Sequence, residues 1–256
     1  MKTCEESLEI LDSYVRETEG LFKRITSYVE KPKLVTFDGG VKFDHESKNS
    51  VLACYLKLAR VISGLNAMKL FIKNSYFQEA GVLCRTIIDF CDEISFVLDA
   101  STESDITAAR CFLKDFYQEV STEQSKGREL NKREHGVGRK KMYAAAGRTF
   151  QKYGVGDTHT LQQTGLFRND LFSNFVHGAY PVVTEMYSLT GEIGLRGSME
   201  KSLLPQWVDQ FNLITHKVLI AATRLALEVN QFPLGEAAKL LTREFEAQQD
   251  DLWCVS

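Results

Sequence analysis

Apolar residues recur along most of the chain at the spacing of one helix face. The clearest stripe begins the sequence and consists of Leu8, Leu11, Val15, Phe22, Ile25 and Val29. This heptad-like spacing predicts a first helix of about six turns that ends at Lys31-Pro32. Its narrow apolar stripe is typical of a helix that packs inside a bundle. The alternative is that this stripe forms a coiled-coil-like contact between two chains.

Broader apolar faces predict the central helices of the fold. One runs to about Lys73 and has Asn49 or Ser50 as its N-terminal cap. The next runs from Tyr76 to about residue 99, with Ser75 as its cap. A third apolar helix begins near residue 202 and ends at Pro233.

Weaker helical patterns and breaks fill the remainder of the chain. The segment from Pro32 to Lys48 contains Asp38-Gly39-Gly40, which predicts a loop or a small hairpin. Shorter helices are expected over residues 104–120, 139–153, 158–177, 182–189 and 235–248. Gly178 is placed to stop the helix that ends at His177.

These elements predict an all-α fold, a helical bundle of about seven to eight helices with two or three long central ones. We expect a single domain over residues 1–256, with a basic linker around 121–141 and a Gly-interrupted loop around 190–201. The chain has only four Pro, which agrees with a helical protein.

Bulk composition excludes few functions. The formal net charge of −3 gives no general preference for nucleic acid or for an anionic membrane surface. The six Cys form no CxxC pair and no zinc-like spacing, so reduced thiols in a cytoplasmic protein are expected. We find no signal peptide and no run of 18 apolar residues, so no membrane span is predicted.

One segment departs from the overall acidity of the chain. Residues 126–141 carry seven Lys and Arg against two Glu, a net charge of +5. A solvated linker or helix surface is the ordinary explanation for such a run. The alternative is contact with phosphate groups of a nucleic acid. The basic residues that would make that contact are Lys132, Arg133, Arg139, Lys140 and Lys141.

The densest chemistry lies between residues 167 and 180, where an Arg, amides, a carboxylate and a His occur together. On a helix, Phe167, Leu171, Phe172, Phe175 and Val176 are predicted to share the inner, apolar face. Asn169, Asp170, Ser173, Asn174 and His177 would share the outer one. Arg168 would fall within the apolar face, where it must extend to solvent or meet a carboxylate.

A second polar group lies on the predicted helix over 76–99. Arg85, Asp89, Asp92 and Glu93 fall in one sector, with Arg85 and Asp89 at i,i+4. A solvated helix face with one ion pair is the simpler interpretation. The alternative is that this sector pairs with Arg168 or His177 of another helix.

Known catalytic patterns are missing from the sequence. We find no Ser-His-Asp order, no HExxH, no kinase signature and no phosphate loop, and no cofactor or metal site is predicted. His45, His135, His159 and His216 occur singly, so each is expected to be structural or exposed.

The order Arg168-Asn169 and then His177 resembles the motif of HEPN-type proteins, in which an Arg and a polar residue precede a His by a short interval. The segments CRTIIDFCDE (84–93) and SNFVHG (173–178) also resemble uncharacterised all-α bacterial proteins, some of them grouped with abortive-infection or toxin–antitoxin genes. The resemblance covers about residues 76–187. It implies a helical bundle, often dimeric, that acts in antiviral defence as a metal-independent ribonuclease, with RNA and a second copy of the chain as partners.

By this resemblance, His177 acts as base or acid on a ribose hydroxyl or leaving oxygen. Arg168 stabilises charge in the transition state and Asn169 orients the phosphate. Arg85, Asp89, Glu93, Asp170 and Asn174 form a supporting polar network.

The sequence departs from the family pattern because eight residues separate Arg168 from His177. On one continuous helix, these two side chains lie about 180° apart. They would meet only if the helix ended early or if a second subunit completed the site. The rival hypothesis is a non-enzymatic interaction module, such as an immunity or scaffold protein, in which Arg168, Asp89, Glu93 and His177 form a structural network.

Overall fold

The computed structural model describes residues 2–37, 40–100, 102–117, 137–152, 157–188, 190–195, 197, 201–229 and 232–254. Most of the predicted basic linker, including Lys132 and Arg133, therefore lies outside the described residues. Within the described part the chain is an all-α helical bundle, as the sequence predicts.

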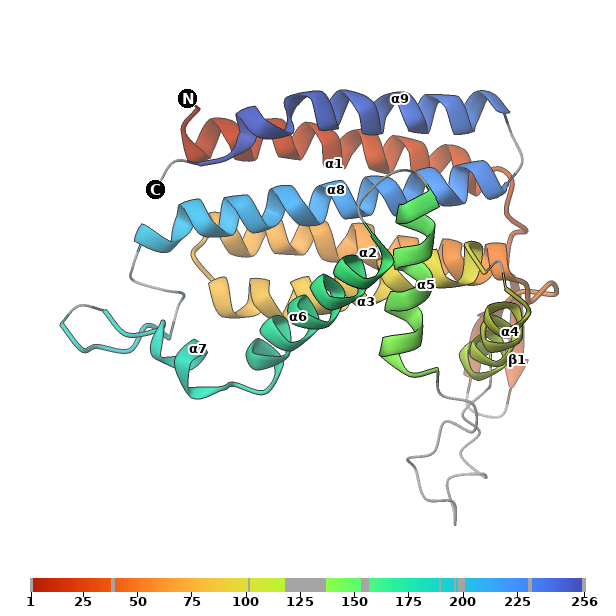
Figure 1. The fold of residues 1–256 in the computed structure, drawn as a ribbon, viewed down its shortest axis with the longest axis horizontal. Coiled ribbons are helices and arrows are strands. Elements are labelled where there is room, and N and C mark those ends of the chain that lie inside the picture. Colours follow the sequence, from red (N-terminus) through yellow and green to blue (C-terminus); the bar gives the residue numbers. More distant parts are fainter. Residues whose placement is uncertain are drawn as a thin grey trace, which may run out of the picture.

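The helices and the one described hairpin follow each other along the chain in a simple order (Figure 1). The elements are α1 (Cys4–Thr26), β1 (Lys33–Phe37), β2 (Gly40–Asp44), α2 (Ser50–Lys73), α3 (Phe77–Leu98), α4 (Glu103–Tyr117), α5 (Arg139–Lys152), α6 (Thr158–Val176), α7 (Tyr180–Thr184), η1 (Lys201–Leu203), α8 (Leu204–Glu228), α9 (Phe232–Gln249) and η2 (Asp250–Leu252).

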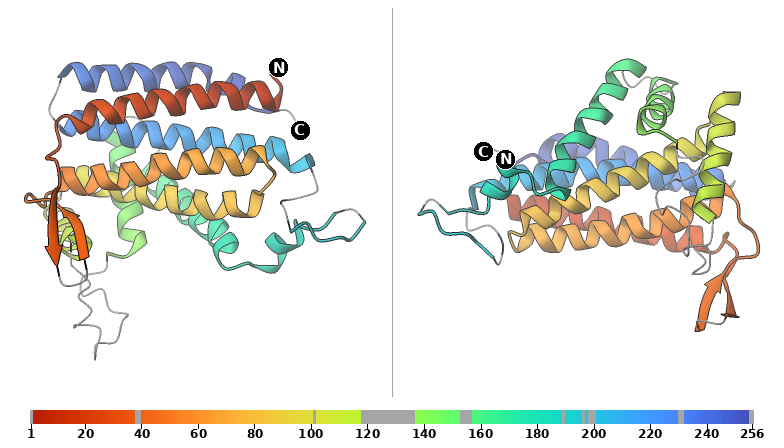
Figure 2. Two further views of the ribbon diagram at one scale, coloured as in Figure 1. Left: turned by 180° about the vertical axis from the view of Figure 1, so that it is seen from behind. Right: turned by 90° about the horizontal axis from the view of Figure 1, so that it is seen from below.

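Five long helices form the body of the molecule. Helix α8 packs against α1, α2, α3 and α9, so it is the central helix. Helices α5 and α6 pack against each other and against α3, on the side of the body away from α1 and α9 (Figure 1). The view from below shows α6 running outward from this body, with its later residues nearest to it (Figure 2).

Local sequence signals explain where several helices begin. Thr3 and Glu6 form a reciprocal capping box at the start of α1. Asn49 caps α2 and its side chain accepts a 2.9 Å hydrogen bond from the Leu52 N–H. Asp157 caps α6 in the same way, since its side chain accepts hydrogen bonds from the His159 and Thr160 N–H groups.

Gly178 ends α6 as predicted, since it adopts φ +58° directly after the C-cap residue His177. The predicted hairpin is also present, as an antiparallel pair in which Lys33 lies opposite Asp44.

Several boundary predictions are wrong. Helix α1 ends at Thr26 and not at Lys31-Pro32, and the short helix expected over residues 182–189 is α7, Tyr180–Thr184. Ser75 does not cap α3, because it takes φ +60° in the turn and Tyr76 occupies the cap position without a side-chain bond. Pro233 does not end the long helix, because α8 already ends at Glu228, with Val229 as its C-cap. Pro233 instead lies in the first turn of α9, where a missing N–H costs no helical hydrogen bond.

The buried apolar side chains form one connected core that extends from α1 to the segment after α9. Helices α2, α3 and α8 contribute most of it, while α5 and α6 contribute Ala145 and Phe172. An aromatic group joins the outer helix α6 to this core. Trp207 of α8 stacks on Phe77 at 5.7 Å between ring centroids and meets Phe175 of α6 edge-on at 5.5 Å.

Candidate functional site: a polar cluster between α3, α5 and α6

Three helices bring five polar side chains together where α5 and α6 meet α3. Arg85 and Asp89 come from α3, Arg139 and Tyr143 from α5, and Asn169 from α6. Arg139 Nη1 lies 2.7 Å from Asp89 Oδ1 and also donates to the Asn169 side-chain oxygen. Tyr143 donates to that same oxygen at 3.1 Å. Arg85 Nη1 lies 3.4 Å from Asp89 Oδ1 and donates to the Asn169 backbone carbonyl at 3.2 Å. We call these five residues the polar cluster.

The cluster is largely removed from water. Arg85 is 8% exposed and Tyr143 is 4% exposed, whereas the Arg139 side chain is 44% exposed and forms the open edge. Burial raises the pKa of Asp89 to about 6; Arg85 opposes the rise, while the nearby Glu93 and Asp92 add to it. Burial also raises the pKa of the Tyr143 hydroxyl, so it remains a hydrogen-bond donor.

A close approach of two helices allows Asn169 to reach the cluster. Gly165, one turn before Asn169, lies against the Tyr143 ring, and a Cβ there would be 3.0 Å from it. The absence of a side chain at Gly165 therefore brings α6 close to α5. Asn169 then points inward, between the two Arg side chains and Tyr143.

The orientation of α6 contradicts the predicted inner face. Phe172 is buried, but Phe167 is 68% exposed, Leu171 is 40% exposed and Val176 is 48% exposed. Asn169, which the pattern predicts on the outer face, contacts α3 and α5. The reason is energetic: the Asn169 side-chain oxygen accepts hydrogen bonds from Arg139 and from the buried Tyr143 hydroxyl, and an apolar side chain in this place would remove that acceptor.

The structure does not bring the predicted catalytic residues Arg168 and His177 together within one chain. Helix α6 is unbroken from Thr158 to Val176, and His177 is its C-cap. Nine residues along such a helix separate the two Cα atoms by roughly 14 Å and place them on opposite sides. Neither side chain has a hydrogen bond or an ion pair with the residues that the structure describes, and His177 is exposed.

The predicted supporting residues separate into two groups. Arg85 and Asp89 are in the polar cluster, and Asp170 touches its edge by accepting a 3.1 Å hydrogen bond from the Asn169 amide. Asn174 and Glu93 lie elsewhere, Asn174 being exposed on α6.

Glu93 belongs to a different buried site. Its carboxylate pairs with Lys57 of α2 at 2.5 Å. The Lys57 ammonium also lies 4.8 Å from the Phe90 ring centroid, 5.1 Å from that of Phe112 and 4.7 Å from that of Phe116. This cation–π box joins α2, α3 and α4.

The polar sector of α3 is thus not the solvated face that was the simpler interpretation. Asp92 pairs with Lys217 of α8 at 2.5 Å, and this carboxylate is 6% exposed. Each acidic residue of the sector therefore has a cation from another helix. The partners are Arg139, Lys217 and Lys57, in place of the predicted Arg168 and His177.

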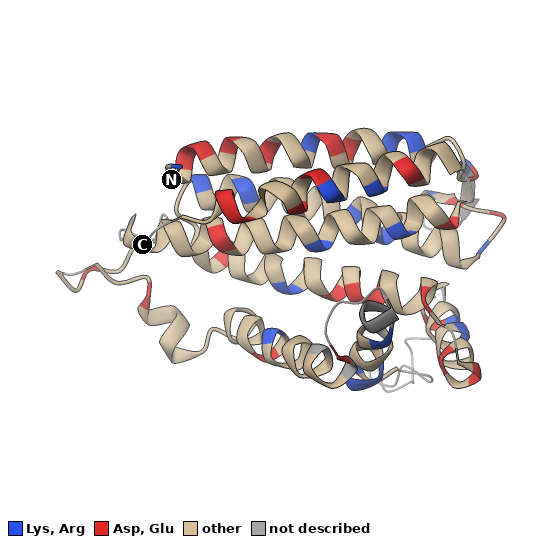
Figure 3. Ribbon diagram, turned by 45° about the horizontal axis from the view of Figure 1, so that its top comes forward, with Lys and Arg blue, Asp and Glu red and all other residues tan. Residues whose placement is uncertain are grey.

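Residues of the basic segment that the structure describes have separate environments. Arg139 is a member of the polar cluster, whereas the Lys141 ammonium donates to the Ser104 hydroxyl and carbonyl on α4. Lys140 is exposed, and its backbone carbonyl accepts a hydrogen bond from Gln162. Acidic and basic residues are interspersed on the helices seen in Figure 3, without a large face of one sign.

Sequence reasoning missed Arg139 and Tyr143 as members of one site. Arg139 falls in the basic segment 126–141 and Tyr143 on the helix predicted over residues 139–153, so neither is predicted to contact Asp89 or Asn169. One signal was present: a buried Arg85 and Asp89 at i,i+4 need further polar partners, and Arg139 and Tyr143 lie four residues apart on one helix face.

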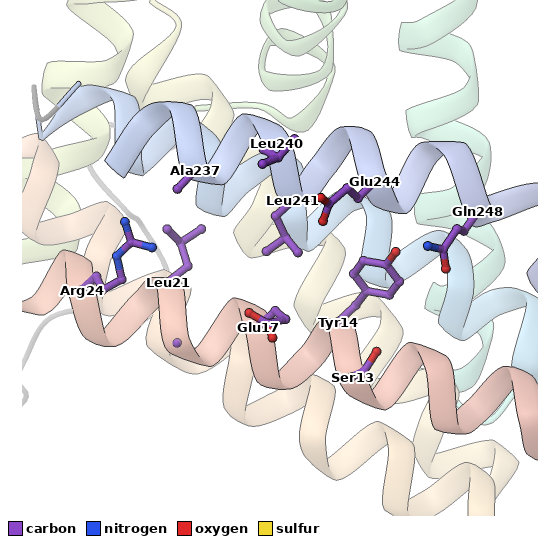
Figure 4. Close-up of a pocket in the computed structure, with 11 residues that line it drawn as sticks. Ser13, Tyr14, Glu17, Leu21, Arg24, Ala237, Leu240, Leu241, Glu244 and Gln248 are labelled. Atoms are coloured by element: carbon purple, nitrogen blue, oxygen red, sulfur yellow. The ribbon is translucent and has the colours of Figure 1, made fainter. Parts of the chain in front are cut away.

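A hollow lies on the side of the molecule away from the polar cluster, between α1 and α9 (Figure 4). Its volume is about 610 Å³. The lining residues are Ser13, Tyr14, Glu17, Gly20, Leu21, Arg24, Ala237, Leu240, Leu241, Glu244 and Gln248. Burial, with Glu244 nearby, raises the pKa of Tyr14. The polar residues of this hollow are spread along its two walls in Figure 4 and do not converge on one point.

Within the described residues, no group of three or more His, Cys, Asp or Glu side chains is arranged to hold a metal ion. In that same part of the chain, α2 is the one helix long and apolar enough to cross a membrane by length and composition. Its apolar window is 56% buried inside the bundle, as is common for a core helix.

Comparison with known proteins gives no relative to guide the assignment. No family model, no curated protein and no solved structure matches this chain.

Proposed function

We propose that the protein is a non-enzymatic helical interaction module that associates with a second copy of itself through α6. One observation carries the proposal: α6 points its polar Asn169 inward and its apolar Phe167 and Leu171 outward. Large apolar side chains that stay exposed next to each other on a helix are typical of contact surfaces.

The charges beside this apolar pair favour a second copy as the partner. At about 100° per residue, Arg168 lies about 80° to one side of the midline between Phe167 and Leu171, and Asp170 about 80° to the other. When two copies of α6 lie parallel around a two-fold axis, Arg168 of each chain faces Asp170 of the other. An antiparallel pair would instead place like charges together.

The polar cluster has a supporting role in this proposal. Its hydrogen bonds and ion pairs hold Asn169 against α3 and α5, and thereby fix the rotation of α6 about its axis. A buried polar network specifies orientation in this way because other rotations leave its members unsatisfied.

Charge-reversal variants test the proposed contact. Light scattering measures the molar mass of each variant as a function of protein concentration. We expect Arg168→Glu and Asp170→Arg each to weaken association by roughly tenfold or more, since each places like charges in contact. The double variant Arg168→Glu with Asp170→Arg restores opposite charges and should restore association. A wild-type protein that stays monomeric at all concentrations, or a double variant as weak as the single ones, would contradict the proposal.

A matched pair of surface substitutions distinguishes this contact from nonspecific hydrophobic association. Phe167→Ser should reduce association, whereas Phe232→Ser on α9 should not, although Phe232 is 79% exposed and Phe167 is 68% exposed. Equal effects of both variants would mean that association does not involve α6.

RNA cleavage is a second candidate function, and one observation favours it. Asp89, whose pKa is raised to about 6, lies beside two Arg side chains at the partly open edge formed by Arg139. A carboxyl group with a pKa near neutrality suits general acid–base chemistry, and Arg side chains suit phosphate binding. In this version of the prediction Asp89 replaces His177 as the base, and Arg139 replaces Arg168.

A cleavage assay on single-stranded RNA distinguishes the two versions. Loss of cleavage in Asp89→Asn and Arg139→Gln, with activity kept in His177→Ala, supports the polar cluster. Loss in His177→Ala, with the helical circular dichroism unchanged, supports the original assignment to Arg168 and His177. No cleavage by the wild-type protein leaves the interaction module as the proposed function.

A further inference from the structure

The two ends of the described chain bring two thiols together. Cys4 is the first residue of α1, and Cys254 follows η2. The N- and C-terminal ends lie close to each other in the fold (Figure 1). Cys254 is 8% exposed and belongs to the apolar core, and the partly buried Cys4 packs against that core. Both are free thiols, and Cys4 lies near enough to Cys254 to contribute to the raised pKa of the Cys254 thiol.

Neighbouring residues hold this pair in place. Asp209 of α8 accepts a 2.9 Å hydrogen bond from the Cys254 backbone N–H and so fixes the segment that carries this thiol. Ser7, one turn after Cys4 on α1, is fully buried near the Cys254 thiol. The two thiols therefore belong to a packed site and not to loose chain ends.

The two thiols differ in access and in acidity. Burial raises the pKa of Cys254 to about 12, and the neighbouring Cys4 and Asp209 add to this rise. Cys254 is consequently protonated at neutral pH and unreactive towards reagents in solution. Cys4 is partly exposed, so it is the thiol that a dissolved reagent reaches first.

We propose that Cys4 and Cys254 form a modification site that a low-molecular-weight disulfide, such as oxidised glutathione, converts into an intramolecular disulfide. In the first step Cys4 loses its proton and attacks the small disulfide, which gives a mixed disulfide and releases one small thiol. In the second step Cys254 gives up its proton and attacks the Cys4 sulfur, which releases the second small thiol. The chain loses two hydrogens and two electrons, and the small disulfide gains them.

This bond would tie the start of α1 to the segment after η2 across almost the whole chain. A crosslink between residues 4 and 254 lowers the conformational entropy of the unfolded chain far more than that of the folded chain, because the two ends are already neighbours in the fold. We therefore expect the oxidised protein to be more resistant to thermal unfolding.

The experiment treats the full chain with oxidised glutathione, blocks remaining thiols and maps the peptides by mass spectrometry. We expect a Cys4–Cys254 crosslinked peptide, faster migration in a denaturing gel without reductant, and a Tm raised by several degrees. Reduction with dithiothreitol should reverse all three changes.

Variants test the pairing itself. Cys4→Ser should abolish the crosslink and the Tm rise, and Cys254→Ser should do the same if it folds. Cys111→Ser is the matched control, since Cys111 is the other partly exposed Cys and should not affect the result. A mixed disulfide that persists on Cys4, a crosslink between Cys4 and Cys111, or bonds only between chains would overturn the proposal.

Discussion

Helices α8 and α6 both pack on α3, but they do so with different chemistry. The contact with α8 is mainly apolar, as in the stacking of Trp207 on Phe77. The contact with α6 is apolar at one end, where the Phe175 ring lies against Gly81, and polar at the middle, where the Asn169 backbone carbonyl accepts a hydrogen bond from Arg85. Apolar contact supplies most of the stability of a fold, whereas a buried polar contact selects one orientation. The comparison teaches that α8 makes the bundle stable, and that the polar cluster determines which side of α6 faces outward.

The largest effect is expected from the removal of Trp207, the α8 residue whose ring contacts Phe77 of α3 and Phe175 of α6. We expect Trp207→Ala to lower the free energy of unfolding by about 3–5 kcal/mol, because it leaves a cavity beside Phe77 and Phe175. Urea unfolding followed by circular dichroism measures the change. The control Tyr180→Ala removes an aromatic side chain that is 82% exposed and should cost less than about 0.5 kcal/mol. Similar losses in the two variants would mean that the aromatic group does not join the helices.

A second test adds one methyl group to α3 at its contact with α6. A Cβ at Gly81 would lie 2.3 Å from the Phe175 ring, so Gly81→Ala must shift α6 or its Phe side chain. We expect a loss of about 1–3 kcal/mol in unfolding free energy. Gly20→Ala is the matched control on α1, since it meets nothing within 4 Å. It should stabilise the protein by about 0.5–1 kcal/mol through helix propensity. A stabilising Gly81→Ala would contradict the close approach of α6 to α3.

A smaller effect comes from the titration of Asp89. Its pKa is about 6 in the folded protein and 3.8 in its ordinary state, so the folded chain keeps this proton over a range where the unfolded chain loses it. The resulting stabilisation is complete below about pH 4 and disappears as the pH rises through 6. We expect the difference in Tm between wild type and Asp89→Asn to change by a few degrees in favour of the variant between pH 4 and pH 7. A constant difference over this range would show that Asp89 is not the titrating group.

The smallest effect on stability should come from the exposed face of α6. Phe167→Ser removes a side chain that is 68% exposed, so the unfolding free energy of the monomer should change by less than about 0.5 kcal/mol. Dilute protein is needed for this measurement, because association would add its own stabilisation. A loss above about 2 kcal/mol would mean that Phe167 is part of the core, as the sequence pattern first indicated.

Much of the fold could be predicted from local patterns. Asn49 as the cap of α2, Gly178 as the stop of α6 and the hairpin around Gly40 follow from the chemistry of single residues. The polar cluster was only half predictable. Arg85 and Asp89 were expected to act together, but the pairing of Asp89 with Arg139 joins residues 50 positions apart. Local rules indicate that Arg85 and Asp89 need further polar partners, but they do not identify which distant residue supplies them.

The sequence by itself determined that this chain is helical and where most helices begin and end, because caps, turns and apolar spacing act within a few residues. Only the tertiary structure decided which side of α6 faces the body of the molecule. Apolar residues occur at several angles around α6, so its own sequence permits more than one rotation. The choice is made by Arg139 and the buried Tyr143 hydroxyl of α5, which donate to the Asn169 side-chain oxygen, and this contact places Asn169 inside and Phe167 outside.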